Sequence, residues 1–590
     1  MNNERSNMEL TSRLLFRLLP MQIFLALASS MNAIISGLFA TNFIGSEAMT
    51  AVGLYSPINM FIFAISTMLV GGATIMCGKY MGRDEQEKVQ GIFSLGNILA
   101  FLVALLFIAI YVVAGIFDLT GVMTNDPAVR PIFNQYLIGQ SFGLLPLLLG
   151  NQLAAFLSIE NRASRTTVAS FIFLIVNILL NFLFVDKLQM EAFGLALASS
   201  LGAWAFFIAQ AVYFFKPSAE LRLFSKDLTW SETSQIVKIG IPGAASYGYQ
   251  TLRGLIVNKL LEVFVGSAGV SALAGSDNLM RIAWTLPAGM MAVSRMVISI
   301  SVGEEDKQTL TDVMRNMFRR FIPLMCAVCV LIMACAVPLT KLYYRDTSDP
   351  VFMMTVWGFR ILPLCMPLSI ICMHFTVYAQ ATGKQVLVHL LSALDGVVSV
   401  VAFTALLIPS VGMNSVYVAN VLNGVVTTIV VFAYSIIIRK CFPKNMEELM
   451  VIPDGFGVED DQRMDISVKS MEDVVSVAKE VQDFCEERGI DRKRSYYAGL
   501  FLEEMAGNVV DHGFLKDKKK HNIDIRVVKK DDDVIMRIKD DCVAFDPATR
   551  RDLADPKDIA KNIGIRMVYK LTDRIDYKNM LGLNVLTVRI

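Results

Sequence analysis

Charged side chains are scarce in this sequence of 590 residues: Asp, Glu, Lys and Arg together make up 18%, whereas 54% of the residues are hydrophobic. A soluble protein of this length cannot bury so much apolar surface, so burial in a membrane is the simplest explanation. The charges are also uneven, because they concentrate beyond residue 465. The composition therefore predicts a long membrane part followed by a soluble part. The formal net charge of +1 gives no support for nucleic-acid binding.

Two motifs that would indicate other functions are missing. An ATP-driven pump needs a phosphate-binding loop of the form GxxxxGK[ST], and the nearest string, Gly383-Lys384-Gln385, lacks both its first glycine and its final serine or threonine. Of the nine cysteines, only Cys326 and Cys329 form a CxxC pair, which lies in an apolar run with no second pair after it. We therefore expect packing at this pair, not a zinc or redox site. Direct ATP-powered transport is disfavoured.

Long apolar runs dominate the first 440 residues. A helix needs about 20 apolar residues to cross a bilayer, and only helices satisfy their own backbone there. Twelve runs meet this length, at residues 14–40, 51–78, 92–117, 132–158, 166–186, 193–215, 236–263, 270–300, 320–340, 352–379, 385–408 and 414–438. Basic residues gather in the loops on the N-terminal side, whereas the other side carries only Arg130, Lys187, Lys341 and Arg345. By the positive-inside rule we expect a multi-pass protein of the inner or plasma membrane with both termini cytoplasmic.

Short strings recur in the two halves of the apolar region. Phe43–Ala51 is similar to Phe264–Ala272, and Leu145–Leu147 is similar to Leu362–Leu364. Internal repeats of this kind are common in transporters. We therefore expect two six-helix lobes, residues 1–220 and 221–440, followed by a linker at 441–464 and a soluble domain at 465–590.

Several motifs follow the order and spacing of the multidrug and toxic compound extrusion (MATE) family, which residues from about 10 to 440 resemble. These motifs are Pro20, Ile35–Phe39, Gly45, Ala51–Leu54, Asn177–Asn181, Ile239–Gly243 and Gln380–Lys384. The resemblance implies a mainly α-helical protein whose two lobes form a V and export small organic molecules, often cations, in exchange for H⁺ or Na⁺. A lipid or polysaccharide flippase of the wider superfamily is the alternative, since no residue fixes the substrate.

Two acidic residues that part of this family uses for ion coupling are missing from the first lobe. Ser36 stands in place of the aspartate of the first span, and Asn181 in place of that of the fifth. These replacements argue against proton coupling through the first lobe.

The second lobe carries ionisable residues inside its predicted spans, which are costly there and mark candidate functional sites. The transport candidates are Lys259, Asp277, Arg281 and Asp395. Asp277 and Arg281 are four residues apart and can pair on one helix face. Asp395 has no partner in its own span, although Lys259 can reach it from another helix. We rank Asp395 first for coupling, because a buried carboxylate readily takes up a proton.

Beyond the linker the pattern becomes that of a soluble α+β domain, and about 125 residues are enough to fold alone. Amphipathic helices are expected at Met471–Arg488 and Asp491–Asp511, and strands at Met464–Lys469, Asn522–Lys529, Asp533–Lys539 and Leu583–Ile590.

Three motifs of this domain suit a nucleotide. Glu504 and Asn508 are four residues apart and share one face of the second helix. An asparagine oxygen can bind Mg²⁺, and a carboxylate one turn away can act as a base. Asp540 ends a strand, and Gly564 lies at the start of a further helix, where backbone N–H groups suit phosphate.

This ordered set resembles the GHKL ATP-binding fold, most of all the compact anti-sigma-factor serine kinases. The resemblance implies an α+β sandwich that binds ATP and Mg²⁺, with Glu504 as catalytic base and Asn508 holding the Mg²⁺. It also implies that Asp540 binds the adenine amino group and that Gly564 lies under the phosphates. The other nucleotide-binding candidates are Asp511, His512, Gly513 and Phe545. Glycines usual in the family are replaced by Cys542, Ala544 and Asn562, and the following loop is basic at Arg550, Arg551, Lys557 and Lys561.

A membrane sensor histidine kinase is the third class considered. It needs a phosphoacceptor histidine ahead of its ATP domain, but no histidine lies between residues 439 and 508; the four are His374, His389, His512 and His521. We therefore favour a secondary transporter whose cytoplasmic domain either phosphorylates serine or threonine on a partner protein or only senses ATP.

Overall fold

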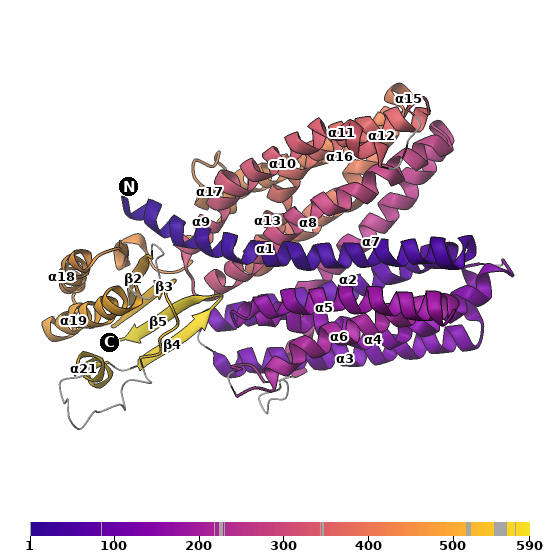
Figure 1. Ribbon diagram of the computed structural model, residues 1–590. Helices are drawn as coiled ribbons and strands as arrows, with labels where there is room; N and C mark the ends of the chain where they lie inside the picture. Colours follow the sequence, from indigo (N-terminus) through magenta and orange to yellow (C-terminus); the bar gives the residue numbers. More distant parts are fainter. Residues whose placement is uncertain are drawn as a thin grey trace.

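The computed structural model describes the whole chain except residues 1, 84, 125, 218, 223–227, 229, 343, 345–346, 515–520, 531, 548–562 and 573. Long helices form two lobes, and a small α+β domain lies against one end of them (Figure 1). The predicted basic loop with Arg550, Arg551, Lys557 and Lys561, and the motif residue Asn562, lie outside the described residues.

The first lobe, called here the N-lobe, is a bundle of long helices. Its members are α1 (Asn2–Phe39), α2 (Ser46–Gly82), α3 (Gln86–Ile116), α4 (Val129–Ile159), α5 (Ala163–Asn181) and α6 (Glu191–Phe214). Helix α4 packs between α3 and α6, while α5 packs against α6 and α1. Two π-helical turns, Ala40–Ile44 and Phe182–Lys187, end α1 and α5.

The second lobe, called here the C-lobe, contains more and shorter helices. They are α7 (Thr233–Phe264), α8 (Ser267–Gly303), α9 (Lys307–Asn316), α10 (Ile322–Ala334), α11 (Ala336–Lys341), α12 (Pro350–Ile361), α13 (Cys365–Thr382), α14 (Gln385–Ala393), α15 (Ser399–Val411) and α16 (Asn414–Arg439). Several spans are divided in two by a local change of helix type, at the π turns Met317–Phe321 and Leu394–Val398 and the 3-10 turn Leu362–Leu364. A short helix, α17 (Met446–Met450), follows in the linker.

Eleven helical segments of the described chain are long and apolar enough to cross a membrane. The prediction of twelve is therefore not confirmed in full. The stretch expected at 236–263 is helix α7, but it falls short in composition, because it carries Lys238, Arg253, Lys259 and Glu262. The CxxC residues are free thiols, with Cys329 buried and donating to the carbonyl of Pro363, as expected for packing.

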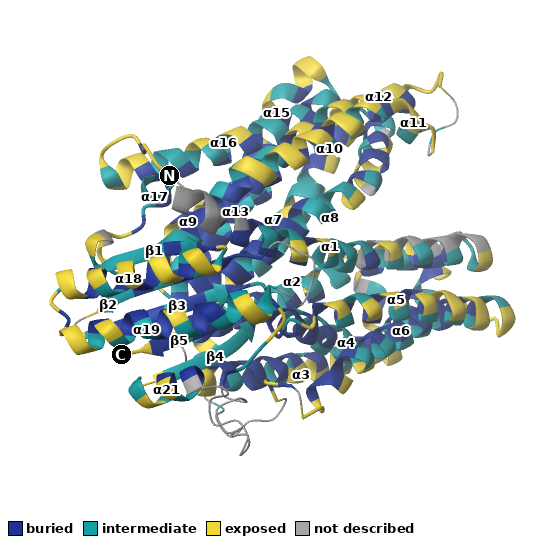
Figure 2. Cartoon of the chain, turned by 60° about the vertical axis from the view of Figure 1, so that its left-hand side comes forward, coloured by how far each residue is buried: buried dark blue, intermediate teal, exposed yellow. Residues whose placement is uncertain are grey.

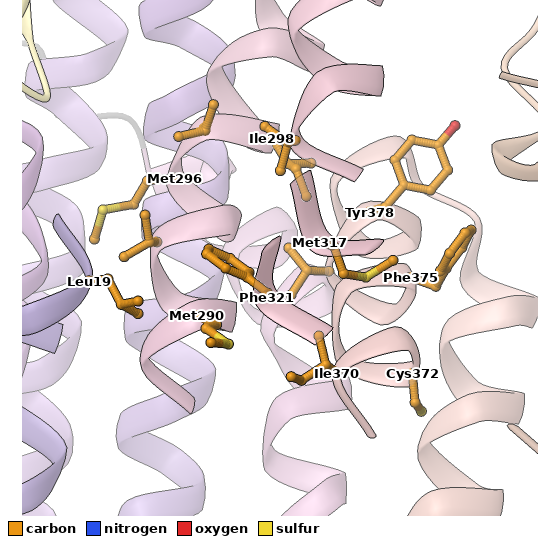
Figure 3. Packing of buried hydrophobic residues seen from close by; sticks show 14 of the residues in the cluster. Leu19, Met290, Met296, Ile298, Met317, Phe321, Ile370, Cys372, Phe375 and Tyr378 are labelled. Atoms are coloured by element: carbon orange, nitrogen blue, oxygen red, sulfur yellow. The ribbon is translucent and has the colours of Figure 1, made fainter. Parts of the chain in front are cut away.

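Helix α8 is buried on two sides, since it packs against α1 of the N-lobe and α13 of its own lobe. Figure 3 shows Met290 and Ile298 on α8, with Met317 and Phe321 of the π turn filling the space toward α13. The side chain of Leu19 on α1 lies on the opposite side of α8. This continuous apolar core fixes α8 at the boundary between the lobes.

The two lobes touch through glycines in the half nearer the α+β domain. An ideal Cβ on Gly72 of α2 would lie 2.0 Å from the carbonyl oxygen of Ile236, and one on Gly240 of α7 would lie 2.0 Å from that of Met68. Only glycine permits so close an approach of two helix backbones. Away from the domain, the lobes diverge (Figure 1). The chain is therefore closed on the domain side and open on the other.

The C-terminal domain is a five-stranded antiparallel sheet in the order β1-β2-β3-β5-β4, covered by helices on one face. Its elements are β1 (Arg463–Val468), α18 (Met471–Glu487), α19 (Arg492–Asn508), β2 (Ile523–Lys530), β3 (Asp533–Asp540), α21 (Ile563–Leu571), β4 (Arg574–Met580) and β5 (Leu583–Arg589). The expected helices and strands are present, and β4 is an additional strand. Alternate residues of β3 (Val534, Met536 and Ile538) are buried under the helices, which leaves the other face of the sheet toward the two lobes (Figure 2).

Candidate functional sites

The N-lobe carries a cluster of uncharged polar side chains where the coupling acids were expected. Asn181 donates to Oδ1 of Asn177 at 3.0 Å, and Asn177 donates to Oγ of Ser199 at 3.1 Å. The hydroxyl oxygens of Ser199 and Ser36 are 3.4 Å apart, and all four residues are buried. The predicted residues Ser36 and Asn181 thus belong to one network, which contains no group that titrates near neutral pH.

Asp395 lies in the π turn between α14 and α15, where three helices meet. Asn423 of α16 donates to its Oδ1 at 2.8 Å. Arg253 of α7 donates to its backbone carbonyl oxygen at 3.4 Å. The carboxylate is therefore held by an amide and lies beside an arginine. Lys259, the expected partner, does not contact the Asp395 carboxylate.

Lys259 pairs with Glu262 on its own helix at 3.0 Å, and both side chains are strongly exposed, at 72% and 62%. The predicted contact between Lys259 and Asp395 is therefore wrong, because Lys259 lies on the outer face of α7. Asp277 and Arg281 are also exposed and, although both are described, form no ion pair with each other. Arg253 and Arg281 both lie close enough to Asp277 to stabilise its negative charge.

In the C-terminal domain, the predicted phosphate and metal residues lie together. An ideal Cβ on Gly564, in the first turn of α21, would lie 1.7 Å from Oε2 of Glu504, so the Glu504 carboxylate rests directly on that turn. Asn508 donates its amide to the backbone carbonyl of Glu504. Because the amide nitrogen makes this bond, the Asn508 oxygen is the atom left for a metal. The π turn Val509–Gly513 then ends the helix.

Asp540 is buried, with 4% of its surface exposed, at the end of β3. Its Oδ1 accepts from the backbone N–H of Cys542 at 2.9 Å and from Asn584 of β5 at 2.7 Å. Burial raises the pKa of Asp540, and these donors oppose the rise. Tyr577 of β4 links Asn584 to the backbone N–H of Phe545, so that Phe545 is tied to the same network.

The remaining predicted residues lie at the end of α19. Asp511 and His512 are exposed, and Gly513 packs against Cys542, whose Sγ would be 3.1 Å from a Cβ on that glycine. The cysteine that replaces the usual glycine of the motif therefore fills the space beside Gly513. Asp540 nevertheless stays buried and keeps its two hydrogen bonds.

The described residues fit ATP with Mg²⁺ in kind and position. Asp540 offers a buried carboxylate for an adenine amino group, Asn508 an amide oxygen for the metal, and α21 a helix N-terminus for phosphate. One rearrangement is required, because the Glu504 carboxylate now lies where phosphates would approach the first turn of α21.

The uncovered face of the sheet is docked on the C-lobe by buried ion pairs. Glu304, which ends α8, is 2% exposed and pairs with Lys539 at 2.7 Å and Arg537 at 3.2 Å. Asp306, which begins α9, pairs with Arg526 at 2.8 Å and with Lys539 at 3.3 Å. Although burial opposes ionisation of Asp306, these two cations outweigh it and hold its pKa well below the usual range.

The domain also contacts the N-lobe. Arg13 of α1 pairs with Asp541 at 3.2 Å, and Arg17 donates to the carbonyl of Gly582 in the β4–β5 turn. Leu581 of the same turn is 2% exposed and donates its backbone N–H to the carbonyl of Ile159, at the end of α4. The hairpin is thus tied to α1 and α4 of the N-lobe, and its Met580 and Leu581 line a small cavity together with Val297 and Ile300 of α8 in the C-lobe.

Asp541 links the docked surface to the nucleotide motif. It follows Asp540 directly, and its other oxygen lies 3.0 Å from Nδ1 of His521. The ligand atoms of His521, Asp541 and Cys542 lie within 4.8 Å of one another. Since Arg13 already supplies a positive charge to Asp541, this cluster is neutralised without a metal ion.

These docking residues were not predicted from the sequence. Arg526, Arg537 and Lys539 alternate with apolar residues, which is also the pattern of a solvated sheet face. A signal was nevertheless present: Glu304, Glu305 and Asp306 are three consecutive acids in a loop on the side where basic residues prevail.

We expect Asp524 of β2 to make the docking dependent on pH. Burial, mainly, and repulsion from Asp312 and Asp306 raise its pKa to about 7, against the opposing effects of Ser467 and Lys539. A carboxyl with a raised pKa favours the docked state when protonated, and this contribution is lost as pH rises from about 4 to 7. We expect docking to weaken by up to about 1.4 kcal/mol per pH unit in that window.

Hydrogen exchange of β2 and β3 in the full chain at pH 5.5 and 7.5 measures this effect. Asp524→Asn should dock more tightly at pH 7.5 and lose the difference between the two pH values. Asp533→Asn, at an exposed pair with Arg589, is the control and should keep it. Equal pH dependence in both variants would show that Asp524 is not responsible.

Two protein families match this chain. MatE matches residues 20–183, and the histidine kinase-like ATPase domain matches residues 468–590. Among curated relatives, the probable multidrug resistance protein NorM of Bacillus licheniformis is 23% identical over 301 residues, which cover 49% of this chain and 64% of the relative. The NorM of Halalkalibacterium halodurans is 20% identical over 329 residues, covering 53% of this chain and 71% of the relative. The chain thus spans slightly less than two thirds of the first of these relatives.

Solved structures show the same fold for the membrane part. An outward-facing multidrug resistance MATE transporter of the MOP superfamily has a TM-score of 0.67 at 19% identity, covering 72% of this chain and 95% of that chain. A mutant of the Vibrio cholerae MATE transporter VcmN has a TM-score of 0.68 at 18% identity, covering 76% and 100%.

Proposed function

Because the membrane part of this chain is similar to MATE transporters and its C-terminal part matches a histidine kinase-like ATPase domain, we propose that it is a secondary transporter of small organic molecules regulated by that domain. The observation that carries the proposal is the docking of one domain on both lobes, through Glu304 and Asp306 on the C-lobe and Arg13 and Arg17 on the N-lobe. A body tied to both lobes on their closed side opposes their separation there.

Two short connections along the chain join the candidate nucleotide site to the residues that hold the two lobes. Asp540, the candidate for adenine, is followed directly by Asp541, the partner of Arg13. Lys539, the residue before Asp540, pairs with both Glu304 and Asp306. When ATP and Mg²⁺ are bound, the phosphates would bring negative charge to the start of α21. A movement of β3 that accommodates the adenine would therefore shift three consecutive residues, two of which hold the transporter.

The test uses the full chain in nanodiscs. Spin labels at cysteines introduced for Phe215 and Phe442, both exposed at the domain-side ends of the two lobes, report the distance between them by pulsed electron resonance. We expect a non-hydrolysable ATP analogue with Mg²⁺ to change this distance distribution, and Asp540→Asn to abolish the change. A distribution unaffected by nucleotide in the wild type, under conditions where the analogue binds, would refute the regulatory role.

Ion coupling through the C-lobe is a separate part of the proposal, with Asp395 as the group that exchanges H⁺ or Na⁺. Asp395→Asn should abolish uptake driven by an imposed pH or Na⁺ gradient in proteoliposomes, while the Asn423 contact can be kept by the new amide. Glu262→Gln, at an exposed pair, is the control. If Asp395→Asn leaves transport and its ion dependence unchanged, coupling lies elsewhere.

Two alternatives are part of the same proposal. The domain could transfer phosphate to serine or threonine of a cytoplasmic protein, with Glu504 as base. Incubation of the full chain with labelled ATP and cell extract tests this, because label on a second protein requires transfer.

For the membrane part, the MATE relationship favours organic cations as substrates and leaves a lipid or polysaccharide flippase as the alternative. The charges of the two lobes bear on that choice.

A further inference from the structure

Charge inside the membrane part is confined to the C-lobe. The middle of the N-lobe spans contains no Asp, Glu, Lys, Arg or His, at residues 20–39, 50–78, 89–116, 131–159, 166–185 and 192–214. The C-lobe spans carry more basic than acidic side chains, which are Arg253, Lys259, Arg281, Arg295 and Arg360 against Glu262, Asp277 and Asp395. Because charges within a membrane are costly and mark ligand or ion sites, the sign of this excess bears on the ligand.

Arg295 lies on α8 where the lobes meet. Its Nη1 would be 3.6 Å from a Cβ on Gly71 of α2, so the guanidinium reaches the N-lobe. Its Nη2 contacts only the sulfur of Met291, at 3.8 Å, and its Nε is buried with no hydrogen-bond partner. In the part of the chain that the structure describes, Arg295 forms no ion pair. A guanidinium that is largely buried without a negatively charged partner is strongly unfavourable. A bound anion would supply that partner.

Arg281 is a further arginine of α8, and among the described residues it lies near Asp277 without forming an ion pair with it. It is exposed on the same helix, 14 positions before Arg295 and so about 21 Å along the axis toward the open side. Separation of the lobes on the domain side would uncover Arg295, whereas Arg281 is uncovered now. Each arginine therefore faces solvent in a different state of the transporter.

The acids of the C-lobe are less available than these arginines. Asp277 has Arg253 and Arg281 as neighbours. Asp395 holds the amide of Asn423 and lies beside Arg253. A cationic ligand would have to approach both carboxylates against the field of Arg253, whereas an anionic ligand meets Arg295, whose Nε is buried without a hydrogen-bond partner.

We propose that this transporter takes organic anions, with a carboxylate, sulfonate or phosphate group as the recognised element, and that Arg295 and Arg281 bind that group. The inference rests on the proposed transport function and names its substrate class. Arginine suits this role because its planar fork donates two parallel hydrogen bonds to such groups. Arg295 binds the anion when the domain side opens, and Arg281 when the other side is open.

The experiment measures binding to the full chain in nanodiscs of neutral phosphatidylcholine. The probes are carboxyfluorescein, a naphthalene sulfonate and a phenyl phosphate as anions, and ethidium as the cation. We expect at least one anion to bind and to raise the unfolding temperature. Arg295→Gln and Arg281→Gln should each weaken its binding at least tenfold, and Arg295→Lys should retain part of it. Lys259→Gln, at an exposed ion pair, is the matched control.

A second readout separates a ligand site from a structural role. Arg295→Gln removes an uncompensated charge, so the variant without ligand should unfold at a higher temperature than the wild type while no longer responding to the anion. Discs with phosphatidylglycerol identify a lipid source, because that lipid alone would then produce the Arg295-dependent rise.

Two results would overturn the proposal. One is that ethidium binds and none of the three anions or the anionic lipid does. The other is that Arg295→Gln and Arg281→Gln leave anion affinity unchanged. If ethidium is then exported with nucleotide-dependent rates, the regulated transporter stands and only the substrate class fails.

Discussion

Glu304→Gln is expected to release the ATPase domain from the transporter. The side chain of Glu304 is 2% exposed and neutralises both Arg537 and Lys539, so the amide would leave Arg537 without its partner and Lys539 with Asp306 alone. Breaking a buried ion pair on one side costs about 3–5 kcal/mol, which corresponds to a hundredfold or greater shift toward the undocked state. Faster proteolysis of the linker around Asp454 and Gly455, which are exposed, and faster hydrogen exchange in β3 would report the release.

The neighbouring residue provides the control. Glu305 faces Lys530 at 3.8 Å, with side chains 53% and 56% exposed. Exposed pairs contribute less than about 1 kcal/mol, so Glu305→Gln should leave proteolysis and exchange nearly unchanged. If the two variants behave alike, burial of the ion pairs does not hold the domain. If Glu304→Gln undocks the domain without opening the lobes, docking and lobe closure are independent.

Gly564→Val is expected to abolish nucleotide binding to the same domain. A Cβ at this position would lie 1.7 Å from Oε2 of Glu504, so the side chain forces α21 away from α19. Overpacking of this kind costs roughly 1–3 kcal/mol, and we expect nucleotide affinity to fall by about ten- to hundredfold. Titration of the full chain in nanodiscs with a fluorescent ATP analogue measures it.

Gly455→Val is the matched substitution, since nothing lies within 4 Å of a Cβ there. It should bind nucleotide as the wild type does. Both variants should retain the thermal transition of the domain, which shows that the effect is local. Unchanged affinity in Gly564→Val would mean that nucleotide does not approach the first turn of α21.

Docking and nucleotide binding are linked in both directions. If nucleotide changes the equilibrium between docked and undocked domain, undocking must change nucleotide affinity by the same factor. Glu304→Gln should therefore alter the affinity for the ATP analogue, although Glu304 belongs to the transporter and not to the nucleotide motif. A higher affinity in this variant would mean that nucleotide favours the undocked domain. A lower affinity would mean that nucleotide favours the docked domain.

Local periodicity predicted most of the elements, because it reflects the solvent that each face meets. Helices α18 and α19 and strands β1, β2, β3 and β5 follow from the periodicity of their apolar residues. Strand β4 was missed because Arg574–Met580 has no strong alternation, and its partial burial comes from pairing with β5. Helix α7 was predicted as a span but is not apolar enough to qualify as one, since charged residues such as Arg253 and Lys259 interrupt its apolar sequence.

The candidate sites were predictable only where a helix sets the geometry. Glu504 and Asn508 share a face at any tertiary arrangement, whereas the contact of Gly564 with Glu504 depends on how α21 packs. Lys259 was assigned to Asp395 because sequence does not reveal which face of α7 is turned outward. The ion pairs of the docked sheet join residues more than 200 positions apart, and no local pattern contains that information.

The β4–β5 hairpin sets an order of events during synthesis. Arg17 and Gly582 are 565 positions apart, and the membrane helices between them are made first. Translation proceeds at about 5–20 residues per second, and domains fold as they emerge. The last helix of the lobes ends at Arg439, and Gly582 lies 143 positions later, so the complete lobes exist in the bilayer without the hairpin for about 7–30 seconds. The contacts that the hairpin makes with α1 and α4 are therefore added to lobes that have already formed.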